Sequence, residues 1–122
     1  MEMRELVLEA VSTVRCGAAA TEAQLHEQIL DALFRASLAP EHEVTMAKGC
    51  RIDVLCGGIG IEIKKSRPVA SALVRQLARY AACPQIEELI VIAPRGVNLP
   101  RAVGGKRVTM LALERLWGIS LP

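Results

Sequence analysis

The dipeptide Gly57-Gly58 separates two short stretches of alternating residues, and no other feature constrains the fold of this chain as strongly. The pattern predicts a β-hairpin with a two-residue type I′ turn, because both central positions of that turn need a positive φ, which glycine adopts without strain. Counting outward from the turn pairs Val54 with Ile61. The next pair places Asp53 directly opposite Glu62, with Cβ atoms about 4.5–5.5 Å apart.

Strand alternation puts Glu62 and Lys64 on one face of this hairpin, so a lysine stands beside the two carboxylates. Like charges that face each other across a strand pair are destabilising, and the arrangement therefore calls for a cation. Mg²⁺ is the natural candidate, since it prefers oxygen ligands and commonly uses only one or two protein carboxylates. The alternative is an exposed hairpin end at which Asp53, Glu62 and Lys64 form a solvated salt-bridge cluster.

Helix and strand signals alternate along the rest of the chain. Thr21 and Gln24 fit a capping box, which predicts a helix that ends near Ser37. A second helix is expected to open at Ser66-Arg67-Pro68 and to end near Ala82. Short alternating or apolar segments predict strands, and the chain is expected to close with a helix around residues 112–117; the strands are expected near residues 42–46, 51–55, 60–64, 89–93 and 107–111.

Two polar residues lie on helix faces that are otherwise apolar. Gln76 falls within the stripe marked by Val69, Leu73, Leu77 and Tyr80, where an amide is costly unless it is hydrogen-bonded. Glu22 shares a face with Leu25, His26, Ile29 and Leu33, so we expect it to point toward the core. Each could be a satisfied core residue, and Glu22 could instead be an acid at the positive end of the helix dipole.

Length and composition limit the remaining possibilities. A chain of 122 residues with 52% hydrophobic residues predicts one globular domain over residues 1–122, and the N-terminus lacks an apolar signal-type stretch, so we expect a soluble, cytoplasmic protein without a membrane span. Residues 1–62 hold 5 basic and 10 acidic side chains, whereas residues 63–122 hold 10 basic and 3 acidic ones. Bringing these halves together would set carboxylates beside a row of basic side chains, which suits a metal site that faces a polyanion; the alternative is ordinary solvated surface charge. Scattered cysteines predict reduced, mostly buried thiols without a zinc site or disulfide; they are Cys16, Cys50, Cys56 and Cys83.

Asp53, then Glu62-Ile63-Lys64 at a hairpin end, then Gln76 and Tyr80 on the following helix resemble the PD-(D/E)XK nuclease superfamily, and within it the RecB-type branch with a QxxxY motif. The likeness spans residues 21–94. It implies an α/β fold with a restriction-endonuclease-like αβββαβ core, in which a central mixed sheet is flanked by helices. Ile52 stands where the motif name has proline, which removes no ligand.

The resemblance also implies the reaction, which is hydrolysis of phosphodiester bonds in DNA with Mg²⁺ or Mn²⁺. Asp53, Glu62 and the carbonyl of Ile63 would bind the metal, and Lys64 would orient or deprotonate the attacking water. Glu22, in preference to Glu27, would reach the metal directly or through water. Gln76 and Tyr80 would hold DNA phosphate or the geometry of the site, and the nearest basic residues expected to contact phosphates are Lys65 and Arg75.

The same resemblance implies a range of biological pathways and partners. The expected context is prokaryotic or phage DNA repair, recombination or host–phage conflict, with DNA as partner and a larger nuclease/helicase or phage protein as a further possible partner. A homodimer through the apolar stretch Leu111–Trp117 is a second possibility. The cysteines lack the clustered spacing of an iron–sulfur site. The alternative to an enzyme is a non-catalytic DNA-binding or assembly module on the same fold, or an unrelated α/β interaction domain.

Overall fold

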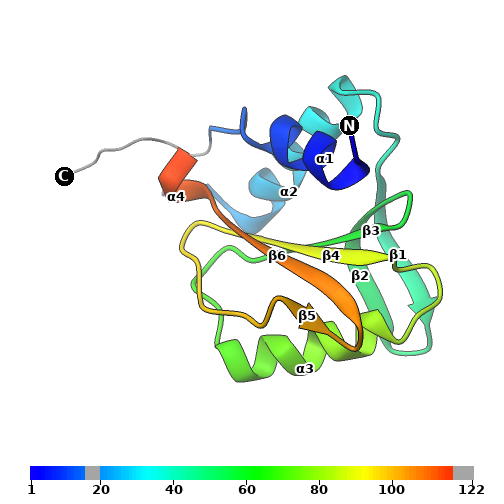
Figure 1. The fold of residues 1–122 in the computed structure, drawn as a ribbon. Coiled ribbons are helices and arrows are strands. Elements are labelled where there is room, and N and C mark those ends of the chain that lie inside the picture. The colour runs from blue at the N-terminus through cyan, green and yellow to red at the C-terminus, as the bar shows by residue number, and fades with distance from the viewer. Residues whose placement is uncertain (16–19, 117–122) are drawn as a thin grey trace.

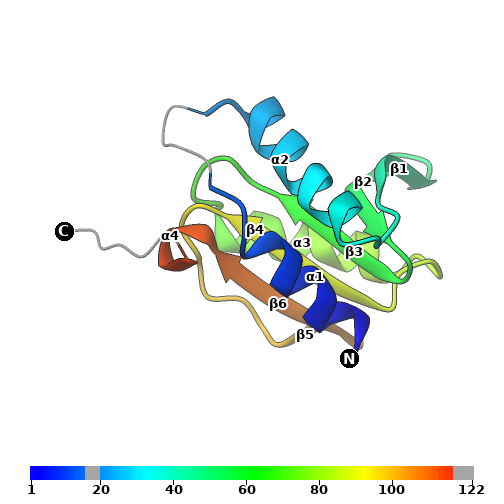
Figure 2. The same cartoon turned by 90° about the horizontal axis from the view of Figure 1, so that it is seen from above.

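A six-stranded sheet in the order β1-β2-β3-β4-β6-β5 forms the centre of the molecule (Figure 1). The structure is a computed structural model, and it describes residues 1–15 and 20–116. Helices α1 and α2 lie over one face of the sheet and α3 over the other, as Figures 1 and 2 show from two directions. The elements in chain order are α1 (Met3–Val11), α2 (Glu22–Arg35), β1 (Glu41–Ala47), β2 (Cys50–Cys56), β3 (Ile59–Ile63), α3 (Ala70–Ala81), β4 (Glu88–Ala93), β5 (Ala102–Val103), β6 (Lys106–Ala112) and α4 (Leu113–Leu116).

The sheet is mixed. Strands β1, β2 and β3 form an antiparallel meander, β3 pairs in parallel with β4, and β4 pairs in parallel with β6. The short β5 closes the far edge antiparallel to β6. The predicted α/β class with a central mixed sheet between helices is confirmed, and the fully apolar run Leu89–Ala93 is the buried inner strand that was expected.

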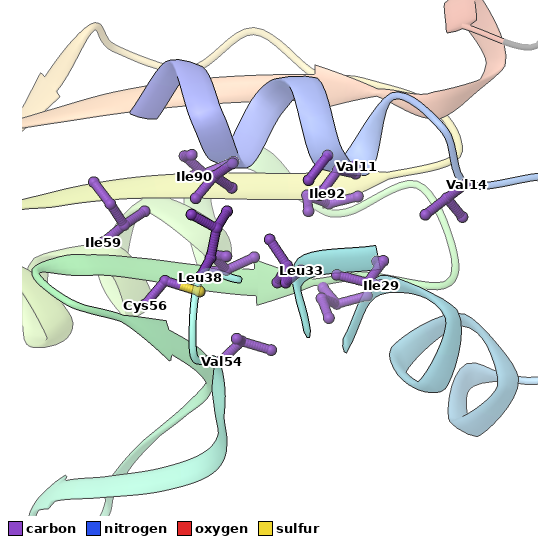
Figure 3. Close-up of a cluster of buried hydrophobic side chains, with 14 of the residues drawn as sticks. Val11, Val14, Ile29, Leu33, Leu38, Val54, Cys56, Ile59, Ile90 and Ile92 are labelled. Carbon is purple, nitrogen blue, oxygen red and sulfur yellow. The ribbon is translucent and has the colours of Figure 1, made fainter. Parts of the chain in front are cut away.

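Each face of the sheet carries its own hydrophobic core. On the α1/α2 face, isoleucines from β3 and β4 meet Val7 and Val11 of α1 and Ile29 and Leu33 of α2 (Figure 3). On the α3 face, Leu89 and Val91 pack with the helix residues Leu73, Leu77 and Tyr80. Alternate residues of β4 therefore serve the two layers, because successive side chains of a strand point to opposite faces.

Helix α1 was not predicted from the sequence. Its residues Val7, Ala10 and Val11 are buried and have the i, i+3, i+4 spacing of an amphipathic helix. A nine-residue helix is marginal on its own, so its stability comes from this packing against the sheet and α2. The two-residue strand β5 was also missed, within a stretch expected to be irregular.

The helix boundaries agree with the prediction at α2 and differ at α3. The Thr21 hydroxyl accepts from the Gln24 N–H at 3.1 Å while the Gln24 side chain accepts from the Thr21 N–H at 2.8 Å, which confirms the capping box. Helix α3 begins at Ala70, later than expected. Val69 is the extended N-cap residue of α3 and is 69% exposed, so its expected place in the apolar stripe is wrong.

The central hairpin has the predicted register beside its turn but a different turn. Residues 54, 55 and 56 pair with 61, 60 and 59, as expected. Only Gly57 of the two turn residues has a positive φ, at 57°, so the turn is not type I′. A positive φ at the first central position alone is the requirement of a type II′ turn, which also suits the twist of a hairpin.

The remaining expectations concern the C-terminus, the thiols and the membrane. Leu113 of α4 is fully buried in the core, which makes it unavailable to a dimer contact, and Trp117 lies outside the described residues. Cys50, Cys56 and Cys83 are buried free thiols, as predicted, while Cys16 lies outside the described residues. Among the described helices, none combines the length and the apolar character that crossing a membrane requires.

Candidate active site

Strands β2 and β3 separate at Asp53, and this separation creates the site. Their pairing stops at Val54 and Ile61, so the prediction that Asp53 and Glu62 form the next ladder pair is wrong. Asp53 Oδ2 instead accepts a hydrogen bond of 2.8 Å from the backbone N–H of Ile63. A carboxylate thus occupies the place of a backbone acceptor, and it lies in the gap between the two strands.

The backbone is also irregular around Asp53 within β2, and in the neighbouring strand β1 opposite it. Ile52 packs in the α3-side core and Val54 in the α2-side core, although a regular strand would turn both to one face. The β1 pairs His42–Val54 and Val44–Ile52 flank this point, and Glu43 between them has a φ of 55°. A left-handed residue other than glycine is uncommon and tends to occur at functional sites.

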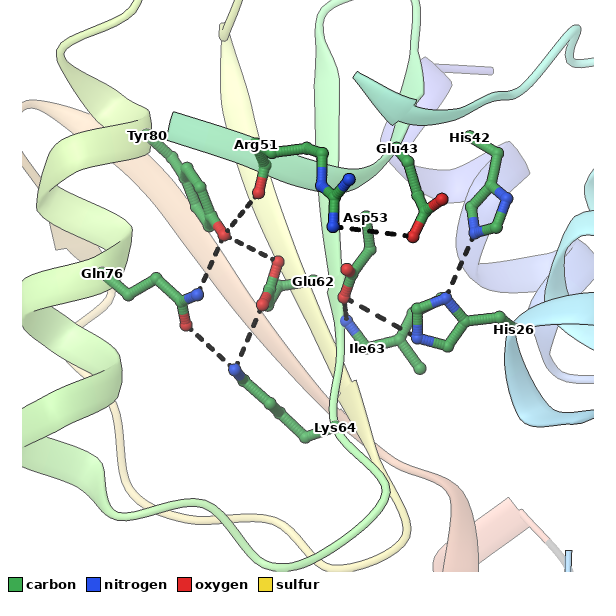
Figure 4. A network of polar contacts seen from close by, with 10 residues as sticks. All are labelled: His26, His42, Glu43, Arg51, Asp53, Glu62, Ile63, Lys64, Gln76 and Tyr80. Carbon is green, nitrogen blue, oxygen red and sulfur yellow. Dashed lines mark hydrogen bonds and ion pairs between the residues drawn. The ribbon is translucent and has the colours of Figure 1, made fainter. Parts of the chain in front are cut away.

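Glu62 projects from β3 toward α3 and is held in a closed polar ring (Figure 4). Its side chain is only 5% exposed, and its Oε2 lies 3.1 Å from Lys64 Nζ. Lys64 Nζ donates to Gln76 Oε1 at 3.0 Å, and Gln76 Nε2 donates to Tyr80 Oη at 2.9 Å. The ring closes where Tyr80 Oη donates to Glu62 Oε1 at 3.0 Å. Tyr80 Oη also lies 3.1 Å from the carbonyl oxygen of Arg51. The predicted need of Gln76 for a polar partner is confirmed.

Burial dominates the acid–base properties of this ring. It raises the pKa of Glu62, the negative charge of Asp53 raises that pKa further, and Lys64 and the Tyr80 hydrogen bond partly oppose the rise. Burial and the neighbouring Glu62 charge also raise the pKa of Tyr80, so its phenol keeps its proton and can donate it. The two carboxylates are therefore electrostatically coupled although they are not a ladder pair.

An imidazole on the core face of α2, that of His26, approaches Asp53. His26 is 8% exposed, and its Nε2 lies 3.9 Å from Asp53 Oδ2, too far for a hydrogen bond. That nitrogen is buried and has no hydrogen-bond partner. Its other nitrogen, Nδ1, lies 3.3 Å from Nε2 of His42 on β1. A polar residue on an apolar helix face, the signal that singled out Gln76, was available for His26 as well.

The other predicted site residues lie around this centre. Glu22 is exposed, so the expectation that it points into the core is wrong; the first turn of α2 extends past the packed part of the helix. It lines a hollow of about 420 Å³ together with Glu27, His26, His42 and Glu43. Lys65 is half-buried just beyond β3, and Arg75 is exposed on α3.

Two carboxylates, one carbonyl and one imidazole are the groups that could hold a cation here. Within residues 1–15 and 20–116, no three His, Cys, Asp or Glu side chains already surround a common metal position. Mg²⁺ nevertheless commonly takes only one or two carboxylates and keeps several waters, a requirement that Asp53 and Glu62 can meet. The Ile63 carbonyl faces the same gap, because the N–H and C=O of a strand residue point to the same side and its N–H reaches Asp53. The unpartnered Nε2 of His26 also fits a cation, since buried polar atoms normally have a partner.

Comparisons of the chain with protein-family models, curated proteins and solved structures found no match. A function therefore has to be inferred from the chemistry of these residues.

Proposed function

We propose that this protein is a metal-dependent nuclease that hydrolyses phosphodiester bonds in DNA, built on the αβββαβ core of the PD-(D/E)XK type. The observation that carries the proposal is the buried Glu62 held against Lys64 beside Asp53, where β2 leaves β3. Burying Glu62 beside a second carboxylate and a lysine is costly for stability, and a buried carboxyl group with a perturbed pKa is typical of functional sites.

Hydrolysis of a phosphodiester needs neutralisation of the phosphate charge and a water that is ionised near neutral pH. A bound Mg²⁺ or Mn²⁺ would supply both effects. Asp53, Glu62 and the carbonyl of Ile63 would hold the ion, with His26 Nε2 as a fourth donor from the opposite layer. The raised pKa of Glu62 agrees with this role, because a buried carboxylate beside another negative charge is stabilised by a cation.

Lys64 is positioned to act on water or phosphate. An ammonium group has three N–H donors, and two of them are directed at Glu62 Oε2 and Gln76 Oε1. The third remains for the attacking water or a phosphate oxygen, and the Lys64 side chain is 30% exposed. On this proposal Gln76 and Tyr80 are positioning residues, since their hydrogen bonds end on Lys64 and Glu62.

Basic side chains around the site would bind the DNA backbone. Arg51 lies next to the site with a 63% exposed side chain and only a long 3.9 Å ion pair to Glu43, so it joins the predicted Lys65 and Arg75 as a phosphate contact. Binding through such contacts weakens steeply as salt rises. The elements described within residues 1–15 and 20–116 include none of the kind that reads base edges, so we propose low sequence specificity.

The alternative is a non-catalytic DNA-binding or assembly module. One observation favours it: both oxygens of Glu62 already have partners within the protein, in Lys64 and Tyr80. In such a module the ring would only stabilise the packing of α3 on the sheet, and DNA binding would not require Asp53 or Lys64.

Cleavage of supercoiled, linear and branched DNA in Mg²⁺, Mn²⁺ or EDTA separates the two functions. We expect metal-dependent cutting that falls at least about 100-fold in Asp53→Asn and in Lys64→Ala. Asp31→Asn and Lys48→Ala are matched controls, because both residues are exposed and are not in the site. Absence of cutting in every metal, together with salt-sensitive DNA binding that survives both site substitutions, would replace the nuclease with the binding module.

A further inference from the structure

The contact between His26 and His42 links two imidazoles that sit at different depths. His26 is buried beside Asp53, whereas His42 is exposed on the edge strand β1. The rings meet edge to face, with centroids 5.5 Å apart and an angle of 66° between their planes (Figure 4). The contact joins His26 Nδ1 to His42 Nε2. The other nitrogen of His26, Nε2, faces Asp53.

When both rings are neutral, one proton lies between His26 Nδ1 and His42 Nε2. Which of these two nitrogens carries the proton determines the tautomer of each histidine. If His42 Nε2 carries it, His26 Nδ1 accepts and His26 Nε2 must carry an N–H, directed at the Asp53 carboxylate. If His26 Nδ1 carries it, His42 Nε2 accepts and His26 Nε2 presents a lone pair. Only the second arrangement allows His26 Nε2 to bind a cation.

The backbone of β1 is shaped to make this contact. The left-handed conformation of Glu43 lies where β1 changes face, so that Val44 packs in the α3-side core while His42 reaches α2. The strain of a left-handed glutamate persists only where the surroundings impose it. The exposed position of His42 lets water satisfy its other nitrogen in either tautomer.

We propose that His42 is a positioning residue, which accepts the Nδ1–H of His26 and thereby presents the Nε2 lone pair of His26 to a cation held with Asp53. The proposal rests on the proposed function, because the cation is the one that the nuclease site would bind. A hydrogen-bond acceptor behind a ligating imidazole orients the ring and raises its basicity.

The change of tautomer in His26 and His42 conserves the number of protons on the two rings and leaves both rings neutral. Without a cation, the carboxylate of Asp53 favours the N–H on His26 Nε2. On binding of a cation, that proton would leave to water, the proton of His42 Nε2 would move to His26 Nδ1, and His42 would take one proton from water on its Nδ1. Both rings thus change from the Nε2–H to the Nδ1–H tautomer together.

Mn²⁺ affinity tests the positioning role directly, through the decrease in the free-ion EPR signal. We expect His42→Ala to weaken Mn²⁺ binding at least about 10-fold, the lower end of the usual effect of removing such a partner. His42→Gln should stay within about 3-fold of the native protein, because the amide oxygen can accept the same hydrogen bond. Thr45→Ala, exposed on the same strand, is the matched control and should leave the affinity unchanged.

The tautomers can be observed by NMR, because the chain contains only two histidines. In histidine-labelled protein, long-range ¹H–¹⁵N spectra should show both rings as Nε2–H without metal and as Nδ1–H with saturating Zn²⁺, a diamagnetic probe. Unchanged tautomers on adding Zn²⁺, or equal Mn²⁺ affinity of His42→Ala and the native protein, would overturn the role of His42 and leave the nuclease proposal standing. A native protein that binds neither ion would overturn both.

Discussion

Replacing Tyr80 with phenylalanine removes one oxygen from the polar ring and leaves the packing of the aromatic side chain intact. That oxygen donates to Glu62 Oε1 at 3.0 Å, accepts from Gln76 Nε2 at 2.9 Å and lies 3.1 Å from the Arg51 carbonyl. Because Tyr80 is 3% exposed, water does not readily replace these contacts. We expect Tyr80→Phe to destabilise the fold by an amount that depends on pH.

The magnitude follows from the charge on Glu62. A hydrogen bond to a charged group contributes about 1.5–3 kcal/mol and one between neutral groups about 0.5–1.5 kcal/mol. Together with the unsatisfied Gln76 amide, the loss should be about 2–4 kcal/mol when Glu62 is ionised and about 1–2 kcal/mol when it is protonated. The free energy of unfolding should therefore fall more at pH 8 than at pH 4.5.

The direction in which stability changes with pH follows from the direction of the pKa shift of Glu62. The folded-state pKa of Glu62 is raised above its ordinary value of 4.5, so its contribution to stability is present at low pH and is lost as pH rises through the folded pKa. The Tyr80 hydrogen bond lowers this pKa. Its removal raises the pKa further and enlarges the loss at high pH.

Urea unfolding of the native protein and Tyr80→Phe at pH 4.5 and pH 8, with EDTA present, measures the difference. Leu77→Ala is the matched control, because it lies on the same helix and creates a cavity without touching the charge on Glu62. If Tyr80→Phe lowers the free energy of unfolding equally at the two pH values, or less at pH 8, then the Tyr80 hydrogen bond does not stabilise an ionised Glu62, which refutes the prediction.

Two further predictions concern packing and thiol chemistry. Leu77→Ala should cost about 2–5 kcal/mol of unfolding free energy in the same urea titration, whereas Phe34→Ala should stay within about 0.5 kcal/mol because Phe34 is 74% exposed; equal losses would contradict the assignment of the core. Burial raises the pKa of Cys56 to about 11, so only about one thiol in a thousand is ionised at pH 8. Iodoacetamide should leave Cys56 unmodified in the folded protein and alkylate it in urea, as judged by peptide mass spectrometry, and rapid labelling of the folded protein would contradict its burial.

Local signals predicted much of the architecture. The capping box at Thr21 and Gln24, the register beside Gly57-Gly58 and the apolar run of β4 each depend on residues close together in the chain. Helix α1 was missed although its spacing was present, because a short segment of mixed polarity becomes a stable helix only through the sheet that it covers.

The site was predictable in part. Alternation along β3 correctly placed Lys64 beside Glu62, and the polar anomaly at Gln76 correctly predicted a hydrogen-bond partner. Tyr80, which the periodicity assigned only to the apolar stripe, joins them in one network. The same reasoning singled out Glu22 on α2 and assigned no site role to His26. The two residues are one turn apart on the same face, and only the extent of overlap between helix and sheet separates an exposed glutamate from a buried imidazole.

The sequence by itself determined the order of the main elements from α2 onward, the hairpin register beside its turn and the charge-bearing positions, because capping, turn geometry and side-chain periodicity act over a few residues. Only the tertiary structure decided where β2 leaves β3, which ring meets Asp53 and how His42 reaches His26. These contacts join segments that are distant along the chain, and their geometry depends on the twist of the sheet and the way α2 packs on it, which no local pattern encodes.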